Sequence, residues 1–205
     1  MASWIQALDL KPGDRVYHMG CGVGYYTAIL AEMVERGGSV VAIDARPDLA
    51  ARARENLSGY SHVVVDAGDA AEFDPGACDA MLINAGVTHP QPIWLDRLRE
   101  GGRLVMPLTV AVSATIGNGV MLKFVRQSGG FSAGLVTLLA IFNGGALRDP
   151  ELDAPLRNWL GKAMSTGAFV KLKSLRRDSH EQNDSCLFHS PTMCLSSLAI
   201  CEPEP

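Results

Sequence analysis

Short apolar runs recur along the first half of the chain, and each ends near glycine, acidic or small residues. They lie at 16–19, 39–43, 63–65, 78–83 and 104–108. Their lengths and boundaries predict buried strands, and apolar residues at helical spacing predict a helix over 27–34. Strands separated by helical or loop segments are typical of repeated βαβ units with a parallel sheet.

The pattern changes after Pro107. Apolar runs at 110–116, 120–125 and 135–142 are broken by Gly117-Asn118-Gly119 and by Ser128-Gly129-Gly130. Asn-Gly and Gly-Gly between apolar runs are hairpin signals, so we expect the sheet to end in antiparallel strands.

Further elements are predicted towards the C-terminus. Asp149 is placed to cap a helix over 151–164 that carries Leu152, Leu156, Trp159 and Leu160 on one face. Strands are expected at 168–175 and 186–196, across a polar loop at 177–184, and residues 202–205 are expected to fray.

These elements together predict a Rossmann-like, doubly wound α/β fold. Its sheet is expected to be mostly parallel, with antiparallel strands at the end and additional C-terminal α+β elements. No repeat or long linker divides the chain, so we expect one domain over 1–205, with a cofactor-binding core at 8–108 and additions at 109–205.

The sequence Gly20-Cys21-Gly22-Val23-Gly24 joins the first predicted strand to the first predicted helix. Glycine is favoured where the backbone needs unusual dihedrals or lies against a ligand, and a helix N-terminus offers free N–H groups. Asp44 closes the next strand, where its carboxylate can accept two ribose hydroxyls. The segment therefore predicts a nucleoside-cofactor site.

Two common nucleotide motifs do not fit this turn. A dinucleotide fingerprint begun at Gly20 requires a small residue at position 25, which is Tyr25, and no Gly-Lys-Ser/Thr of a phosphate loop follows. The remaining pattern, G-x-G-x-G, is that of S-adenosylmethionine enzymes. The next two strand ends carry Asp69, which can accept a hydrogen bond from an adenine amino group, and Asn84.

The stretch from residue 8 to Pro107 resembles the class I S-adenosylmethionine-dependent methyltransferases, and most of all the protein-L-isoaspartate O-methyltransferases. The similar segments are L-K-P-G-D-R-V, G-C-G-V-G-Y-Y-T-A, A-R-A-R-E-N-L and L-R-E-G-G-R-L-V-M-P. The resemblance implies an enzyme whose glycine turn lines the methionine part of S-adenosyl-L-methionine. It places the ribose at Asp44 and the adenine beside Asp69 and Ala70. The expected cofactor-binding set is His18, Gly20, Cys21, Gly22, Val23, Gly24, Asp44, Ala45, Gly68, Asp69, Ala70 and Asn84.

Two departures from that family bear on function. His18 stands where the family usually has an acid near the methionine ammonium. A neutral imidazole there can accept a hydrogen bond, and the alternative is a strand-end histidine satisfied by backbone. Only residues 1–10 precede the segment that leads into the first predicted strand. The family has a longer front segment there, which supplies a lid and a substrate-contacting hydroxyl. We therefore expect cofactor binding with feeble transfer to isoaspartyl peptides.

Asn84 and His89 are the candidate catalytic residues, since the segment after the fourth strand is expected to overhang the transferred methyl. Asn84 can orient an acceptor, and His89 is either a general base or an exposed loop residue. A carboxylate acceptor is already deprotonated and needs no base. The expected function is O-methylation of the isoaspartyl type; a small-molecule O- or N-methyltransferase and a cofactor-binding module without catalysis remain as alternatives.

Composition narrows the partners. The net charge of -4 argues against a nucleic-acid binder, which needs a basic face. No apolar run is long enough to span a membrane and no leader is evident, so we expect a cytoplasmic protein without membrane contact.

The cysteines are odd in number and form no C-x-x-C pair, which fits reduced thiols: Cys21, Cys78, Cys186, Cys194 and Cys201. Cys21 is expected to be packed. Cys186, His189 and Cys194 offer only three zinc ligands among strand-like residues, so we expect buried thiols there and no metal site.

Overall fold

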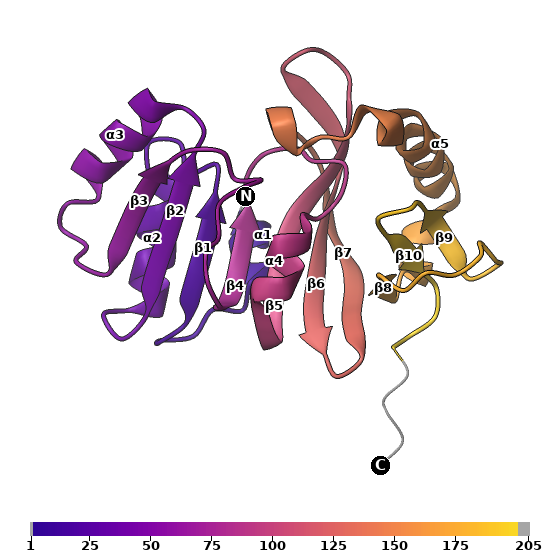
Figure 1. Ribbon diagram of the computed structural model, residues 1–205, viewed down its shortest axis with the longest axis horizontal. Coiled ribbons are helices and arrows are strands. Elements are labelled where there is room, and N and C mark those ends of the chain that lie inside the picture. Colours follow the sequence, from indigo (N-terminus) through magenta and orange to yellow (C-terminus); the bar gives the residue numbers. More distant parts are fainter. Residues whose placement is uncertain (1, 201–205) are drawn as a thin grey trace.

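The computed structural model describes residues 2–200, which are organised on one ten-stranded sheet in the order β3-β2-β1-β4-β5-β6-β7-β8-β10-β9 (Figure 1). The strands are β1 (Arg15–Met19), β2 (Ser39–Asp44), β3 (Val63–Ala67), β4 (Cys78–Ile83), β5 (Leu98–Ala111), β6 (Ile116–Gln127), β7 (Gly130–Phe142), β8 (Ser174–Arg176), β9 (Cys186–His189) and β10 (Cys194–Ser196). Pairing is parallel from β3 to β5 and antiparallel from β5 to β9. This mixed sheet confirms the predicted Rossmann-like fold class, but its antiparallel part, from β5 to β9, is larger than expected, so the sheet is not mostly parallel. The single domain over 1–205 stays a prediction, which the continuity of the sheet supports.

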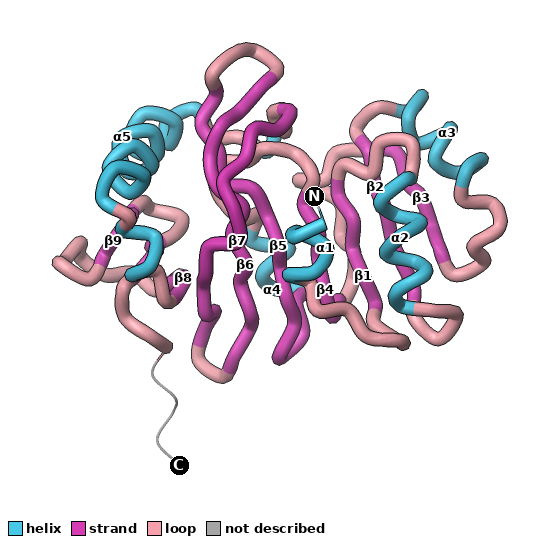
Figure 2. Tube along the Cα trace, turned by 180° about the vertical axis from the view of Figure 1, so that it is seen from behind, coloured by secondary structure: helices cyan, strands magenta, loops and turns pink. Residues whose placement is uncertain are grey.

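Helices cover both faces of the sheet. Helices α1 (Ala2–Ala7) and α2 (Tyr25–Val34) lie on the face seen in Figure 2, and α3 (Pro47–Asn56) packs beside α2. Helices α4 (Pro92–Arg97) and α5 (Pro150–Thr166) pack on the opposite side, and the short 3-10 turns are η1 (Gly145–Leu147) and η2 (Ala168–Lys171).

Strand β1 shows how the alternation of side chains builds two cores. Val16 packs in the cluster that contains residues of α1 and α2, whereas Tyr17 and Met19 pack in the cluster that contains Trp94 of α4. Both faces of the strand are buried because a parallel strand in a doubly wound sheet carries helices on either side.

The hairpin expected at Gly117-Asn118-Gly119 is wrong, because these residues lie inside β6. The chain turns instead at 112–115, where the Ser113 hydroxyl oxygen accepts the N–H of Ile116 at 3.1 Å. Glycine has another role here: a Cβ on Gly119 would lie 2.0 Å from the carbonyl oxygen of Leu108 on β5. The second expected turn, at Ser128-Gly129-Gly130, does connect β6 to β7.

The extents of the two expected C-terminal strands are also wrong. Residues 168–175 form mainly the 3-10 turn η2 and only the start of β8, and residues 186–196 form β9 and β10 with a reversal between them. At that reversal the Ser190 hydroxyl oxygen accepts the N–H of Met193 at 3.2 Å. The helix at α5 is confirmed, with the Asp149 carboxylate accepting the Glu151 N–H at 2.9 Å.

No helix within residues 2–200 combines the length and apolar character needed to cross a membrane. The expected frayed tail at 202–205 and Cys201 lie outside the described residues. The four cysteines within the described part are free thiols: Cys21, Cys78, Cys186 and Cys194.

Gly119→Ala tests the close approach of β5 and β6. The added Cβ would overlap the Leu108 carbonyl, so the strands must separate, and overpacking of this kind costs about 1–3 kcal/mol or more. Gly134→Ala in β7 is the matched control, because its Cβ would meet no atom within 4 Å. Denaturant titration should show a lower unfolding free energy for Gly119→Ala only; equal stability of the two variants contradicts the pairing.

Candidate functional site

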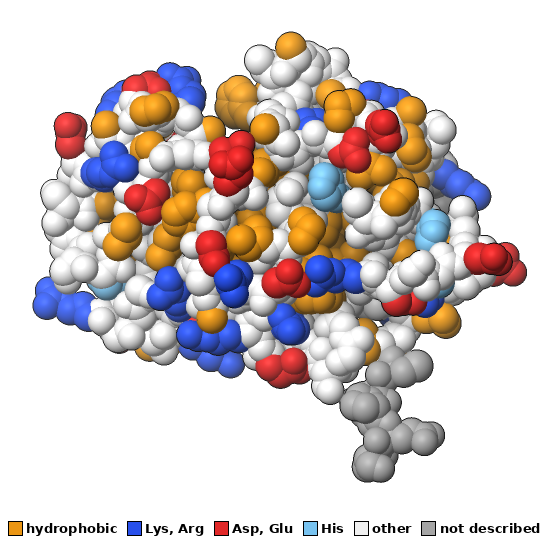
Figure 3. Space-filling model, viewed as in Figure 1, with side chains coloured by type: hydrophobic (Ala, Val, Ile, Leu, Met, Phe, Trp, Pro, Cys, Tyr) orange, Lys and Arg blue, Asp and Glu red, His pale blue; other side chains and the backbone are white. Residues whose placement is uncertain are grey.

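The carboxyl ends of β1, β2, β3 and β4 meet at one edge of the sheet, at the top of Figure 1. Backbone hydrogen bonds join the segments that follow these strands: the Gly20 N–H donates to the Ile43 carbonyl at 2.9 Å, and the Asn84 N–H donates to the Met19 carbonyl at 2.8 Å. The outline of the molecule dips along this edge, between α3 and the β5–β6 hairpin (Figure 3). The sequence-predicted residues are therefore brought together where an α/β sheet binds ligands.

The glycine turn depends on backbone conformations that other residues rarely adopt. Gly20, Gly22 and Gly24 have φ of 74°, 58° and 91°. A Cβ on Gly24 would lie 2.8 Å from Cδ1 of Leu57, whereas one on Gly22 would meet no atom within 4 Å. Gly24 is thus favoured mainly by its positive φ, with Leu57 packed closely against it, and Gly22 leaves the outer side of the turn open.

Asp44 holds this turn against the end of β2. Its Oδ2 accepts the Gly22 N–H at 2.8 Å, and its Oδ1 accepts the Arg46 N–H at 3.0 Å. A carboxylate oxygen can accept more than one hydrogen bond, so both oxygens retain acceptor capacity. The side chain is almost buried, yet it sits beside the open face of Gly22. This geometry suits a carboxylate that receives ribose hydroxyls.

The segment after β3 supplies a second acidic group at the same edge. The Gly68 N–H donates to the Asp44 carbonyl at 3.1 Å, which fixes this segment beside β2. Oδ1 of Asp69 accepts the Ala71 N–H at 2.9 Å, and the side chain is exposed. Ala45 is exposed as well, whereas Ala70 is buried.

His18 is fully buried on the side of the sheet that α2 covers. Its Nδ1 lies 2.9 Å from Oγ1 of Thr27, and its Nε2 has no hydrogen-bond partner. Burial lowers the pKa of His18 to about 4, because the charged ring would lose its hydration. The ring is therefore neutral near pH 7 and does not repel a cation. Its contact with a cofactor stays a prediction.

Cys21 lies between two glycines of the turn and is buried. Burial, and after it the neighbouring Asp44 carboxylate, raise the pKa of its thiol to about 12. The thiol is thus protonated and packed, with no nucleophilic character at neutral pH.

The segment after β4 carries the two candidate catalytic residues. Nδ2 of Asn84 donates to the Gly20 carbonyl at 3.4 Å, which ties the segment to the glycine turn. His89 is half-buried, with Nδ1 at 3.0 Å from Oγ1 of Thr88 and Nε2 at 3.4 Å from Nε2 of Gln91. Burial lowers the pKa of His89, partly opposed by Asp149. Both ring nitrogens are thus engaged within the protein, so the expectation of an exposed loop histidine does not describe it.

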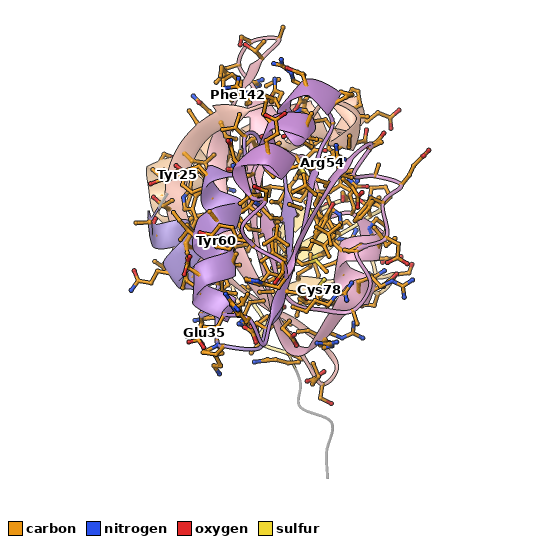
Figure 4. The ribbon with its side chains drawn as sticks, turned by 90° about the vertical axis from the view of Figure 1, so that its left-hand side faces the viewer. Tyr25, Glu35, Arg54, Tyr60, Cys78 and Phe142 are labelled. Atoms are coloured by element: carbon orange, nitrogen blue, oxygen red, sulfur yellow. The ribbon has the colours of Figure 1, made fainter. Side chains whose placement is uncertain are left out.

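The connection from β7 to α5 reaches the same segment, which the sequence did not reveal. The Gly86 N–H donates to the Phe142 carbonyl at 2.7 Å, and the Arg148 guanidinium donates to the Gly86 carbonyl at 3.2 Å. Phe142 and Tyr25 are strongly exposed, at 70% and 68%. Both project from the upper half of the molecule in Figure 4, away from Glu35 at the other end of α2. Isolated polar or aromatic residues carry no pattern that predicts such a contact.

The sequence comparison decides the family. The model of the Protein-L-isoaspartate(D-aspartate) O-methyltransferase family matches residues 1–130, which is more than half of the chain. The chain belongs to this family. The matched residues include the glycine turn, Asp44, Asp69 and His89, whereas Phe142 and Arg148 lie beyond them.

Curated relatives in this family cover similar parts of the chain. Protein-L-isoaspartate O-methyltransferase of Ignicoccus hospitalis is 34% identical over 135 residues, which are 64% of this chain and 62% of the relative. Protein-L-isoaspartate O-methyltransferase 1 of Archaeoglobus fulgidus is 39% identical over 113 residues, 53% of this chain and 52% of the relative. The chain spans about half the length of the curated relatives it matches.

Solved structures agree on the fold of the family. A protein-L-isoaspartate O-methyltransferase superposes with a TM-score of 0.64 and 22% identity, over 80% of this chain and 50% of its own. A Plasmodium falciparum chain described as a protein-L-isoaspartate O-methyltransferase, solved with S-adenosyl-L-homocysteine, gives a TM-score of 0.56 and 19% identity over 69% and 70%. The shared architecture confirms the Rossmann-like fold.

The buried His18 predicts a pH-dependent stability. The unfolded chain binds a proton below about pH 6.5, whereas the folded chain resists it down to about pH 4. The pKa of His18 is lower in the folded chain than in the unfolded chain. The stability that depends on a neutral His18 is therefore fully present above the unfolded pKa and is lost as the pH falls towards the folded pKa. Between pH 7 and 5 the unfolding free energy should fall by roughly 2 kcal/mol from this group.

Denaturant titrations at the two pH values measure this change. His18→Asn should remove this fall in unfolding free energy between pH 7 and 5. Thr27→Ala should keep it, because burial rather than the Thr27 hydroxyl lowers the pKa of His18. An unchanged pH dependence of the unfolding free energy in His18→Asn would show that the His18 ring is not held neutral.

Proposed function

We propose that the chain binds S-adenosyl-L-methionine at the edge formed by the glycine turn, Asp44 and Asp69, and transfers its methyl group. Three features support the fit: acceptor capacity on Asp44, open space over Gly22, and the unpartnered buried Nε2 of His18. When bound, this cofactor supplies a methyl group on a sulfonium sulfur that is already activated for transfer.

Each part of the edge would hold a different part of the cofactor. Asp44 would accept the ribose hydroxyls, and Asp69 beside Ala70 would accept from the adenine amino group. The glycine turn would lie against the methionine part, where Nε2 of a neutral His18 would accept from an ammonium group. The chain's contribution to rate is then orientation and exclusion of water, which can supply several kcal/mol.

The protein carboxylate of an isoaspartyl residue is the acceptor that we propose. The observation behind this choice is the engagement of both His89 nitrogens with Thr88 and Gln91, which leaves no free base beside the fourth strand end. A carboxylate needs no base, whereas a hydroxyl or protonated amine does. The family's name agrees with this acceptor. A cytoplasmic location is part of the same proposal.

The acceptor side of the site would be built partly by the β7–α5 connection. Gly86 is bonded both to Phe142 and to Gly144, whose N–H donates to the Gly86 carbonyl at 2.8 Å. The Thr88 hydroxyl oxygen accepts the Asp149 N–H at 2.8 Å. These contacts hold the β4 segment in one place, so Asn84 would be positioned to orient the acceptor.

Cofactor choice is tested by calorimetric titration. S-adenosyl-L-homocysteine should bind and NAD should not, because Tyr25 stands in place of the third dinucleotide glycine. Asp44→Ala should weaken binding by about tenfold or more, since hydrogen bonds to a charged group contribute about 1.5–3 kcal/mol. Asp48→Ala is the matched control, because that carboxylate is exposed and paired with Arg46. NAD binding without S-adenosyl-L-homocysteine binding refutes the assignment.

Activity is tested with labelled cofactor and a pair of peptides that differ only in an isoaspartyl or an aspartyl residue. Label should enter the isoaspartyl peptide above the Asp44→Ala background and be released by base, as a methyl ester is. Base-stable label would indicate a nitrogen or hydroxyl acceptor instead. Binding without any transfer would indicate a cofactor-binding module.

A further inference from the structure

Two histidines and two cysteines, which are residue types that ligate metals, meet near one end of the sheet. The edge formed by the glycine turn, Asp44 and Asp69, called the cofactor edge below, lies in the other half of the sheet. The ligand atoms of His180, Cys186, His189 and Cys194 all lie within 4.8 Å of one another. They come from β9, β10 and the loop that leads into β9, at the right of Figure 1. The sequence offered only three of them at close spacing, because His180 lies in the polar loop.

The strand reversal brings two of the ligands together. Cys194 of β10 is the direct antiparallel partner of His189 of β9, so their side chains emerge on one side of the pair. Cys186 begins β9 in a turn, with its N–H donating to the Asn183 carbonyl at 3.0 Å and its Sγ accepting the Asn183 N–H at 3.5 Å. A backbone N–H directed at sulfur stabilises a thiolate.

Hydrogen bonds orient His180 as a ligand. Its Nδ1 lies 2.9 Å from the carbonyl oxygen of Asp178 and 3.3 Å from Oδ2 of the same residue. Both partners are acceptors, so Nδ1 carries a proton and Nε2 presents a lone pair. Nε2 faces Sγ of Cys186 at 3.5 Å. A carboxylate or carbonyl behind a metal-bound histidine is the usual outer-shell arrangement at zinc.

The separations suit a tetrahedral ion. Bond lengths of about 2.3 Å to sulfur and 2.0–2.1 Å to nitrogen place ligand atoms roughly 3.3–3.8 Å apart. His180 and Cys186 already have this separation, and the other pairs need to close by about 1.5 Å at most. Nδ1 of His189 is buried without a hydrogen-bond partner, which leaves this ring free of competing contacts at that atom.

We propose that His180, Cys186, His189 and Cys194 bind one Zn²⁺ ion as a structural site. Two thiolates and two imidazoles in tetrahedral arrangement favour zinc among common ions, and four protein ligands leave no position for substrate. The two thiolates balance the charge of the ion. This proposal departs from the expectation, drawn from the sequence, of buried thiols without metal.

The surrounding fold explains what the ion contributes. Strands β8 and β10 have three residues each and β9 has four. Such short strands have few ladder hydrogen bonds, and a bound ion would cross-link β9, β10 and the loop before them.

Metal analysis of the reduced full chain, purified without an affinity metal and incubated with zinc before gel filtration, tests the site. About one zinc per chain is expected for the wild-type protein, and Cys194→Ser and His180→Ala should lose it. Cys78→Ser is the matched control, because Cys78 is a buried free thiol on β4 outside the cluster. Substoichiometric zinc in a protein whose thiols all titrate as reduced overturns the proposal.

Cobalt substitution gives a readout that does not depend on folding of the variants. Co²⁺ in the wild-type chain should show tetrahedral ligand-field bands and thiolate charge-transfer absorption, both displaced by Zn²⁺. An octahedral spectrum without charge transfer would also overturn the proposal. Asp44→Ala should retain full zinc content, so failure of the cofactor site and failure of the metal site are measured separately.

Discussion

Strand β5 joins the two halves of this protein, and the rest of the structure depends on its pairing. It has 14 residues and is bonded in parallel to β4 and in antiparallel to β6. Leu104 illustrates the double role, since it is opposite Met81 on one side and Phe124 on the other, and it is fully buried. Because one strand serves both ladders, a single core extends from Tyr17 beside the cofactor edge to Leu195 in β10.

This pairing also decides which residues surround the candidate site. The antiparallel return of β7 places Phe142 at the carboxyl edge of β4, where its carbonyl accepts from Gly86. Arg148 then bonds Gly86 and Thr109 Oγ1. Residues 1–130 match the family and include the glycine turn and Asp44, whereas Phe142 and Arg148 lie beyond the match. Under the proposed function, differences from relatives in the preferred methyl acceptor are therefore expected to arise from the second half of the chain. The glycine turn and Asp44 would stay the same.

The sequence predicted those features that are encoded by near neighbours in the chain. The run at Cys78–Ile83 is a strand, and Asp149 caps α5, because burial pattern and capping chemistry are local. The glycine turn and Asp44 were also predictable, since the order of strands in a βαβ unit determines which ends meet. Their mutual hydrogen bond, from Gly22 to Asp44, confirms that reasoning at atomic detail.

The errors came from residues whose role depends on distant partners. Gly117 and Gly119 flank Asn118 in a sequence that is typical of a turn. They lie instead in a strand, where a Cβ on either residue would overlap atoms of β5 about ten residues earlier in the chain. The expected strand at 186–196 is divided at Ser190-Pro191-Thr192, which is a turn signal within the sequence itself, and the Ser190 hydroxyl holds the reversal that follows. His180 lies in a polar loop, and only the pairing of β9 with β10 reveals that it faces two sulfurs.

Different interactions hold the chain in place in the two halves of the sheet. At the cofactor edge, backbone N–H groups and left-handed glycines fix the turn, and the surrounding strands are long enough to hold it. At the other end the strands are too short for ladder hydrogen bonds to do the same. Side chains there converge from three segments, with sulfur and nitrogen rather than oxygen as the available donors. The proposed Zn²⁺ ion accepts thiolate and imidazole ligands in a tetrahedral arrangement, and it would cross-link the last strands of the sheet.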